Sequence, residues 1–159
     1  MPTLKRLLIA TDYSDCSRAA FEAALGLATE FGASIDIVHV WSAPYFGPGY
    51  GYGNSATVID PSQHQSLFEL VRQRAMDDMR AFASSVPVAP SVQITTHVES
   101  GEPASKLLEI AERDKPDLIL VGTHGRTGAR RWLLGSVAER IVQHAPSAVL
   151  TVPPPSPTR

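Results

Sequence analysis

Short apolar runs alternate with longer amphipathic segments along the chain. The apolar runs predict strands, and the segments whose apolar residues recur at helical spacing predict helices between them. The predicted strands are Leu4–Ala10, Ser34–Val40, Ser91–Val98, Asp117–Val121 and Ala148–Val152. The predicted helices are Asp15–Phe31, Pro61–Ser85, Pro103–Arg113 and Ser136–His144. This strict alternation predicts an α/β fold, in which helices cover both faces of a parallel sheet.

Residue types at the ends of the predicted helices support these boundaries. Ser14 precedes the first helix, where a side-chain oxygen can cap backbone N–H groups, and Gly32 follows it as a stop signal. Pro103 opens the third helix, and Pro116 lies beyond its end. The apolar stripe of the first helix is expected to contain Ala20, Ala24, Leu27, Ala28 and Phe31.

Two segments fall outside the alternation. Residues 41–60 contain "PYFGPGYGYGN", which has too much glycine and proline for a helix or a central strand. A loop of about twenty residues is usually functional or mobile, so this one is either a mobile surface excursion or a lid or partner contact. The ending "PPPSPTR" predicts a disordered, polyproline-like tail at 153–159, which leaves one domain at 1–152.

Composition narrows the class of protein. The chain has 159 residues, which suits one compact domain, and a formal net charge of −2, which argues against a nucleic-acid or anionic-membrane partner. Its single cysteine, Cys16, excludes an internal disulfide and fits a reducing compartment. No apolar run reaches the length of a membrane span, and the N-terminal run is short for a secretory signal. These features predict a cytoplasmic monomer or small oligomer.

The stretch "VGTHGRTGARRWLLGS" at Val121–Ser136 carries the strongest chemical signal. Its glycines let backbone N–H groups approach a ligand closely, and its three arginines add positive charge. Ser136 and Glu139 have the spacing of a capping box, which would place Ser136 at a helix N-terminus. Unpaired N–H groups and the helix dipole accept phosphate there. A plain surface loop with a helix cap and solvated arginines would show the same features.

The glycine spacing distinguishes this stretch from the common phosphate loops. It is neither a Walker A loop nor the dinucleotide fingerprint G-x-G-x-x-G. Instead, Gly122-x2-Gly125-x9-Gly135-Ser136 resembles the nucleotide-binding signature of the universal stress protein family. The opening "LLIATDYSDCSRAAFEAALGLA" and the stretch "DIVHVW" are similar to the same family. The resemblance covers nearly the whole chain, with the 41–60 loop as its least typical part.

The resemblance implies a particular sheet. A Rossmann-like, adenine nucleotide alpha hydrolase-like fold would give a single domain with an open five-stranded parallel sheet in the order 3-2-1-4-5. Strands 1 and 4 would then be neighbours, and ligands in such sheets bind beyond the carboxyl ends of the strands at this switch point. Residues Ala10–Asp12 and Gly122–Gly125 both belong there.

The ATP-binding branch of the family implies a role for each site residue. Main-chain groups near Val40 would read the adenine edge, and Asp12 would face the ribose or a magnesium ion held with the phosphates. Asp12 could instead be a loop acid that caps the first helix. Val121 and Gly122 would line the ribose. The phosphates would lie in a cradle of Gly125, Gly135, Ser136 and Val137. The implied cofactor-binding set is Ala10, Thr11, Asp12, Val40, Val121, Gly122, Gly125, Arg126, Gly135, Ser136 and Val137, with Asp12 as the metal ligand.

The leading interpretation is a cytoplasmic ATP-binding stress-response protein that acts through its nucleotide state. Hydrolysis would be slow at most, because no general base is evident, although phosphoryl transfer depends chiefly on positioning and charge. A true ATPase or phosphotransferase, a scaffold of the same fold that binds no nucleotide, and a preference for cyclic AMP are the alternatives. His124 is either a phosphate contact or solvated, whereas His39 and Cys16 are interpreted as core and inert residues.

Assembly is expected to involve the last strand. Ala148–Val152 is short and apolar, and it lies at the sheet edge in the implied topology. An exposed apolar edge invites pairing with another chain, and the family resemblance points the same way. We therefore expect a homodimer with antiparallel contacts between these strands.

Overall fold

The computed structural model describes residues 4–42, 61–124 and 134–155, with the backbone alone at 61–67. The strands are β1 (Arg6–Ala10), β2 (Ser34–Trp41), β3 (Ile94–Ser100), β4 (Leu118–Gly122) and β5 (Ala148–Val152). The helices are α1 (Asp15–Phe31), α2 (Pro61–Ala83), α3 (Pro103–Asp114) and α4 (Ser136–His144). The predicted elements are all present, with ends shifted by a few residues.

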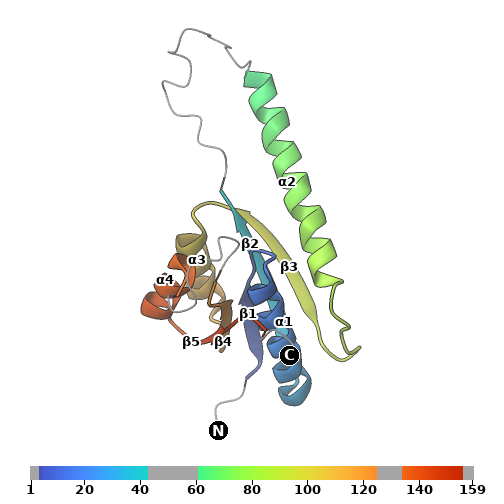
Figure 1. The fold of residues 1–159 in the computed structure, drawn as a ribbon, viewed down its shortest axis with the longest axis vertical. Helices are drawn as coiled ribbons and strands as arrows, with labels where there is room; N and C mark the ends of the chain where they lie inside the picture. Colours follow the sequence, from blue (N-terminus) through green and yellow to red (C-terminus); the bar gives the residue numbers. More distant parts are fainter. Residues whose placement is uncertain (1–3, 43–60, 125–133, 156–159) are drawn as a thin grey trace.

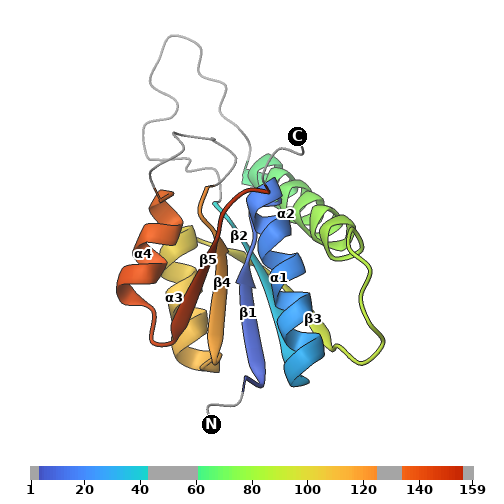
Figure 2. The ribbon, with the colours of Figure 1, turned by 60° about the horizontal axis from the view of Figure 1, so that its bottom comes forward.

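The five strands form one parallel sheet in the order β3-β2-β1-β4-β5, which confirms the predicted topology. The helices cover both of its faces, α1 and α2 on one and α3 and α4 on the other (Figures 1 and 2). The chain reverses its direction of travel across the sheet between β1 and β4, which are neighbours. The fold therefore has a switch point at the carboxyl ends of these two strands.

Alternation along the strands builds two separate cores. In β1, Leu7 and Ile9 belong to the core under α1 and α2, whereas Leu8 and Ala10 belong to the core under α3 and α4. All four side chains are buried, because a central parallel strand is covered on both faces. This explains why β1 reads as a continuous apolar run rather than as an alternating one.

The ends of α1 agree with the sequence, but one predicted core residue does not. Ser14 caps the helix by accepting a hydrogen bond from Ser17 N–H, and Gly32 ends it in the left-handed conformation with φ of 67°. Phe31, expected in the apolar stripe, is 55% exposed. The buried aromatic residue of α1 is Phe21, which stacks on Phe82 of α2.

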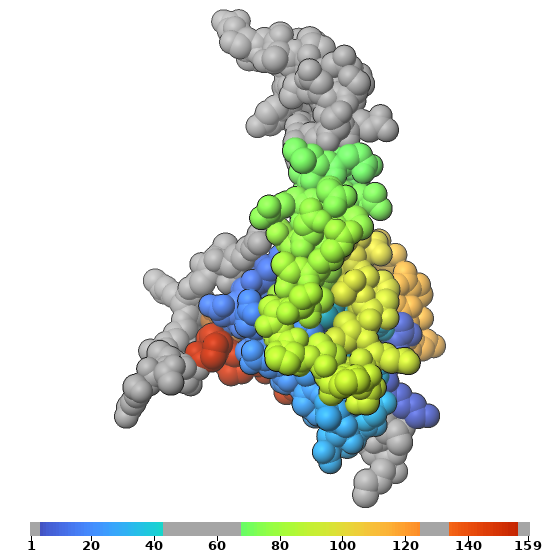
Figure 3. All heavy atoms as spheres, turned by 90° about the vertical axis from the view of Figure 1, so that its right-hand side faces the viewer, coloured from blue at the N-terminus to red at the C-terminus, as the bar shows by residue number. Residues whose placement is uncertain are grey.

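Helix α2 packs on the sheet through its C-terminal half. Ala75, Met79 and Phe82 are buried, whereas Phe68 and Leu70 are exposed. Figure 3 shows the green part of this helix extending above the rest of the described residues, and Phe68 there contacts the ring of Trp41 in β2, with centroids 4.8 Å apart. The predicted loop at 41–60 falls mostly outside the described residues, as do residues 156–159 of the predicted tail.

No helix in the described part of the chain combines the length and the apolar character that crossing a bilayer requires.

Candidate functional site

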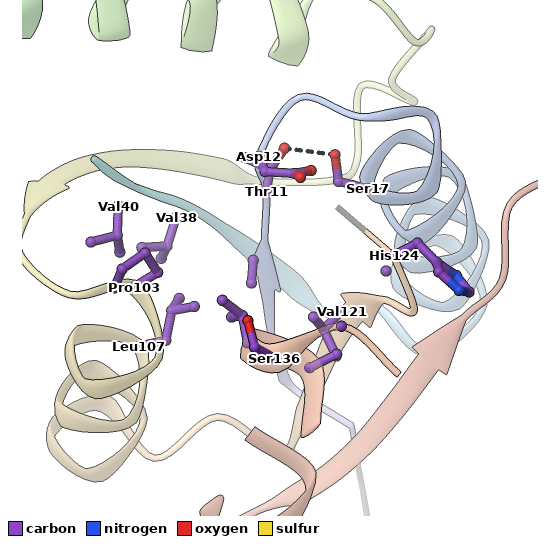
Figure 4. A pocket seen from close by; sticks show the side chains of 15 residues that line it. Thr11, Asp12, Ser17, Val38, Val40, Pro103, Leu107, Val121, His124 and Ser136 are labelled. Carbon is purple, nitrogen blue, oxygen red and sulfur yellow. Dashed lines mark hydrogen bonds between the residues drawn. The ribbon is translucent and has the colours of Figure 1, made fainter. Parts of the chain in front are cut away.

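A cavity of about 260 Å³ opens beyond the carboxyl ends of β1, β2 and β4. Its remaining walls are the first turns of α3 and α4, so it occupies the switch point of the sheet. Figure 4 shows Val38, Val40, Pro103 and Leu107 gathered at one end, with Ser136 between them and Val121. The lining residues are Ala10, Thr11, Asp12, Ser17, Val38, Val40, Pro103, Leu107, Val121, Gly122, His124, Gly135, Ser136, Val137 and Ala138.

Every predicted binding residue that the structure describes lines this one cavity. The residues come from four separate segments of the chain, and the fold brings them together at one edge of the sheet. They are Ala10, Thr11, Asp12, Val40, Val121, Gly122, Gly135, Ser136 and Val137. Gly125 and Arg126, also predicted, lie outside the described residues.

The apolar end of the cavity was largely missed by sequence reasoning. Val38 follows the alternation of β2 and faces the same side of the sheet as Val40. Pro103 and Leu107 come from the first two turns of α3. Valine, proline and leucine carry no chemical signature, so only the packing of α3 over β2 identifies them. Together they form a surface that suits a flat, largely apolar ligand group.

The loop between β1 and α1 is fixed by hydrogen bonds of Thr11. Its N–H donates to Val38 O at 2.9 Å, and its hydroxyl donates to Ser17 Oγ at 3.0 Å. The same hydroxyl accepts from Tyr13 N–H at 3.0 Å. Thr11 and Ser17 are both buried, so these bonds are shielded from water. Thr11 therefore holds the loop in place through a buried polar network.

Tyr13 occupies an unusual backbone conformation next to the cavity. Its φ of 66° lies in the left-handed region, which bulky residues rarely adopt. Its ring stacks on His39 with centroids 4.3 Å apart, and its hydroxyl donates to Ala75 O of α2 at 3.1 Å. His39 Nδ1 lies 2.8 Å from Thr11 O. Because a carbonyl only accepts, Nδ1 carries the proton, and His39 is a hydrogen-bonded core residue rather than a ligand.

Asp12 is the one carboxylate among the described lining residues. Its Oδ1 accepts from Ser14 N–H at 3.1 Å within the loop before α1, whereas the side chain that caps α1 is that of Ser14. The described residues contain no group of three or more His, Cys, Asp or Glu that could hold a metal. One carboxylate fits a magnesium ion only if phosphate oxygens and water complete the coordination. The donor set thus suits a metal that arrives with a phosphorylated ligand.

The start of α4 corrects one sequence prediction. Ser136 is the first helical residue and not the cap, because Gly135 occupies the cap position with φ of −62° and ψ of 151°. Glycine has no side chain with which to cap, so the predicted capping box of Ser136 and Glu139 is not formed. The first intrahelical bond of α4 runs from Glu139 N–H to Gly135 O at 2.8 Å. The N–H groups of the preceding first turn therefore have no acceptor within the helix.

The backbone N–H of Gly135 also differs from its predicted role in the phosphate cradle. It donates to Thr123 O at 2.7 Å and is not directed at the cavity. Thr123 N–H in turn donates to Val152 O at 2.9 Å. Gly135 therefore fixes the entry of α4 relative to β4 and β5. The N–H groups of Ser136, Val137 and Ala138 are the ones that begin the helix beside the cavity.

Gly122 is required by packing as well as by position. A Cβ atom at this residue would lie 2.7 Å from Cys16 Cβ, 3.0 Å from Cys16 C and 3.1 Å from Ser17 N. These atoms belong to the rigid first turn of α1. Glycine at the end of β4 thus allows α1 to approach the sheet beside the cavity. Cys16 is buried in this contact.

Helix α3 begins with a built-in carboxylate. Glu102 is its cap residue and accepts from Ala104 N–H at 3.2 Å and Ser105 N–H at 2.9 Å. The Ser105 hydroxyl donates to the same carboxylate at 2.6 Å. The hydroxyl and the backbone N–H of Ser105 lower the pKa of Glu102 to about 2. Arg140 of α4 pairs with Glu102, with 2.8 Å between Nη1 and Oε2.

The other histidine of the cavity makes a local contact. His124 lines the wall, and its Nδ1 lies 2.9 Å from Thr123 Oγ1. Figure 4 shows its ring at the opposite end of the cavity from Val40 and Pro103. This contact joins two neighbouring residues of the same loop.

The fold is that of an open α/β protein with a cavity at the switch point of its sheet. A sequence model of the universal stress protein family matches residues 3–153, and the chain belongs to this family. A universal stress protein of Methanocaldococcus jannaschii is 35% identical over 153 residues, which span 95% of this chain and 83% of that protein.

Solved structures agree with this assignment. Universal stress protein UspA from Lactobacillus plantarum aligns with a TM-score of 0.75 and 25% identity, covering 96% of this chain and 99% of the other. A universal stress protein solved in complex with cAMP aligns with a TM-score of 0.59 and 23% identity, covering 97% and 100%. The second likeness concerns the fold alone.

Proposed function

We propose that the chain binds an adenine nucleotide in the cavity at the switch point of its sheet. The observation that carries this proposal is the convergence of Asp12, Val40, Gly122 and Ser136 on one cavity, from segments far apart in the sequence. The cavity has an apolar end and a helix N-terminus, as a ligand with a flat base and an anionic group requires. The complex of a similar fold with cAMP supports the class of ligand.

The base belongs at the apolar end. Val38, Val40, Pro103 and Leu107 would enclose the adenine ring, and main-chain groups near Val40 would bind its edge. The ribose would lie over Val121 and Gly122. In this placement the apolar side chains would exclude water from the base. The few polar contacts that fix the orientation of the base would therefore be stronger.

The phosphates belong at the start of α4. Ser136, Val137 and Ala138 present the N–H groups of the first turn, where the helix dipole is positive. Asp12 would contribute one carboxylate oxygen to a magnesium ion bound with the phosphates. ATP with magnesium is the ligand that uses both features, and AMP or cAMP would use the helix terminus alone.

The polar side chains of the cavity favour a binding role over rapid turnover. The Thr11 hydroxyl donates to Ser17, whose own hydroxyl donates to Ser14 O, and Asp12 accepts from the backbone of its own loop. We propose that the protein acts in a cytoplasmic stress response through its nucleotide-bound state, with slow hydrolysis at most. An ATPase with substantial turnover is the alternative that a steady-state assay would reveal.

Assembly is part of the proposal. Strand β5 forms one edge of the sheet, and Leu150 on it is 39% exposed. A partly exposed leucine on an open strand edge supports a homodimer formed by antiparallel β5 strands. The formal net charge of −2 supports the further proposal that nucleic acid is not a partner.

Titration calorimetry with ATP, AMP and cAMP, each with and without magnesium, tests the proposed ligand. We expect wild type to bind ATP more tightly with magnesium, and Asp12→Asn to lose this magnesium-dependent gain while keeping affinity for AMP. Asp15→Asn is the matched control, because Asp15 is exposed in the first turn of α1 and does not line the cavity. Absence of binding to all three nucleotides would contradict the proposal and favour the empty scaffold.

A further inference from the structure

Two helices begin at the cavity, and their N-termini are capped by different kinds of residue. Helix α3 contributes Pro103 and Leu107 to the wall, and α4 contributes Ser136 and Val137. The N-terminus of α3 is capped by the Glu102 carboxylate, whereas α4 is capped by a glycine without a side chain. The free N–H groups and positive dipole of α3 are therefore already satisfied by a negative charge of the chain itself.

The negative charge on α3 is balanced by a positive charge from α4. Arg140 donates from Nη1 to Glu102 Oε2 at 2.8 Å and from Nη2 to Ser105 Oγ at 3.1 Å. Glu102 stays ionised at any pH near neutrality, since its pKa is lowered to about 2. The pair thus joins the two helices that wall the cavity and leaves no net charge at their junction.

We propose that Glu102 and Arg140 set how strongly the cavity prefers a phosphorylated nucleoside over the neutral nucleoside. Both are positioning residues that act through the helix N-termini and the local charge, and neither lines the cavity. The inference rests on the proposed function, because it concerns the same cavity. Glu102 keeps anions away from the α3 end, and Arg140 prevents its charge from weakening the phosphate site on α4.

The geometry limits the size of the effect. Arg140 lies four residues after Ser136, which is about one helical turn or roughly 6 Å along α4. This separation is shorter than the Debye length of about 8 Å at physiological salt, so the charge reaches the phosphate site but is partly screened. Glu102 and Arg140 have side chains that are 54% and 47% exposed. We therefore expect changes of about twofold to fivefold in relative affinity, falling as salt increases.

A purely structural role makes a different prediction from a role in charge balance. If the pair only joined α3 to α4, removing either partner would loosen the same wall and weaken adenosine and AMP together. Charge balance instead requires changes of opposite sign. Glu102→Gln leaves Arg140 unpaired and adds net positive charge, whereas Arg140→Gln leaves Glu102 unpaired and adds net negative charge.

The test measures the dissociation constants of adenosine and AMP by calorimetry, without magnesium, at low and high salt. The quantity compared is the affinity for AMP divided by the affinity for adenosine. Glu102→Gln should raise this ratio about twofold to fivefold, and Arg140→Gln should lower it by a similar factor. The double variant should return the ratio to the wild-type value, because the net charge is restored.

The matched control is Glu109→Gln. Glu109 pairs with Lys106 on the same helix at 2.7 Å but does not line the cavity, so its removal should leave the ratio unchanged. Thermal melts without ligand establish that each variant is folded. Ratios that fall in both single variants, or stay at the wild-type value, would overturn the inference alone. A wild type that binds neither adenosine nor AMP would overturn the proposed function and this inference with it.

Discussion

Replacement of Gly122 by alanine tests whether this glycine serves packing beside the cavity. The new Cβ would lie 2.7 Å from Cys16 Cβ and 3.0 Å from Cys16 C. Carbon atoms pack comfortably at about 3.5–4.0 Å, so α1 would have to move by about 1 Å at its first turn. Such overpacking costs about 1–3 kcal/mol in the free energy of unfolding. The shift would also strain the hydrogen bond between Thr11 and Ser17, which holds the loop of Asp12.

Gly26→Ala provides the matched control for this substitution. Gly26 lies inside α1, and an added Cβ there has nothing within 4 Å. Alanine should stabilise the helix at this position by about 0.5–1 kcal/mol. In urea denaturation, Gly26→Ala should therefore be more stable than wild type and Gly122→Ala less stable. The free energies of unfolding of the two variants should differ by about 1.5–4 kcal/mol. Equal stability of Gly122→Ala and wild type would refute the packing argument.

A second substitution tests whether the thiol of Cys16 or the position of α1 obstructs the added Cβ. The nearest contacts of the added atom are Cys16 Cβ and backbone atoms, which an alanine at residue 16 also possesses. Cys16→Ala should therefore fail to rescue the stability of Gly122→Ala. Recovery in the double variant would show that the thiol, rather than the position of α1, is the obstacle.

Three further predictions concern contacts around the site. Tyr13→Phe removes the hydrogen bond to Ala75 O and should lower the free energy of unfolding by about 1 kcal/mol in urea denaturation, while stacking on His39 is kept. The folded-state pKa of Glu102 is depressed from 4.5 to about 2, so its contribution to stability is present above pH 4.5 and is lost as pH falls toward 2. Glu102→Gln should therefore lose less stability than wild type over that interval in acid titrations followed by circular dichroism. Leu150→Glu should convert the expected homodimer to a monomer by light scattering at micromolar concentration, and a dimer that survives would contradict assembly through β5.

The topology could be predicted because it follows from periodicity and chirality. Strands such as Leu118–Gly122 are apolar throughout, which indicates burial on both faces, and right-handed crossovers leave few arrangements for alternating strands and helices. The family resemblance then selected the order that the structure confirms. The switch point between β1 and β4 followed from this order, and with it the edge at which the cavity lies.

Local details were harder because neighbouring residues compete for the same role. The spacing of Ser136 and Glu139 is that of a capping box, yet Gly135 takes the cap position. The hydrogen bond from Gly135 N–H to Thr123 O fixes where the chain enters α4, and this bond joins residues that no local spacing connects. Phe31 fits the helical stripe of α1 but is 55% exposed, whereas Ala28 and Ala33 on either side of it are buried.

The walls of the cavity show a further limit of sequence reasoning. Pro103 and Leu107 are ordinary helix residues, and their place beside Val40 depends on how α3 lies over β2. The role of Glu102 as a cap was missed for a related reason. A glutamate before a proline has many possible partners, and only the packing of α3 against α4 brings Arg140 to it. Tertiary contacts therefore decide the shape of the cavity and which charges lie beside it, whereas the sequence motif indicates its location.

The distribution of polar partners bears on whether the site binds or turns over its ligand. A group that moves a proton in catalysis must reach the reacting atoms with its donor or acceptor available. Thr11 donates to Ser17, Asp12 accepts from Ser14 N–H, and His124 Nδ1 lies beside Thr123 Oγ1. These contacts rigidify the loops around the cavity and pre-order it for a ligand, which raises affinity by reducing the entropy lost on binding. Under the proposed function, this arrangement would favour holding a nucleotide over transferring its phosphoryl group, and a stable bound state is what a protein that signals through its nucleotide-bound state needs.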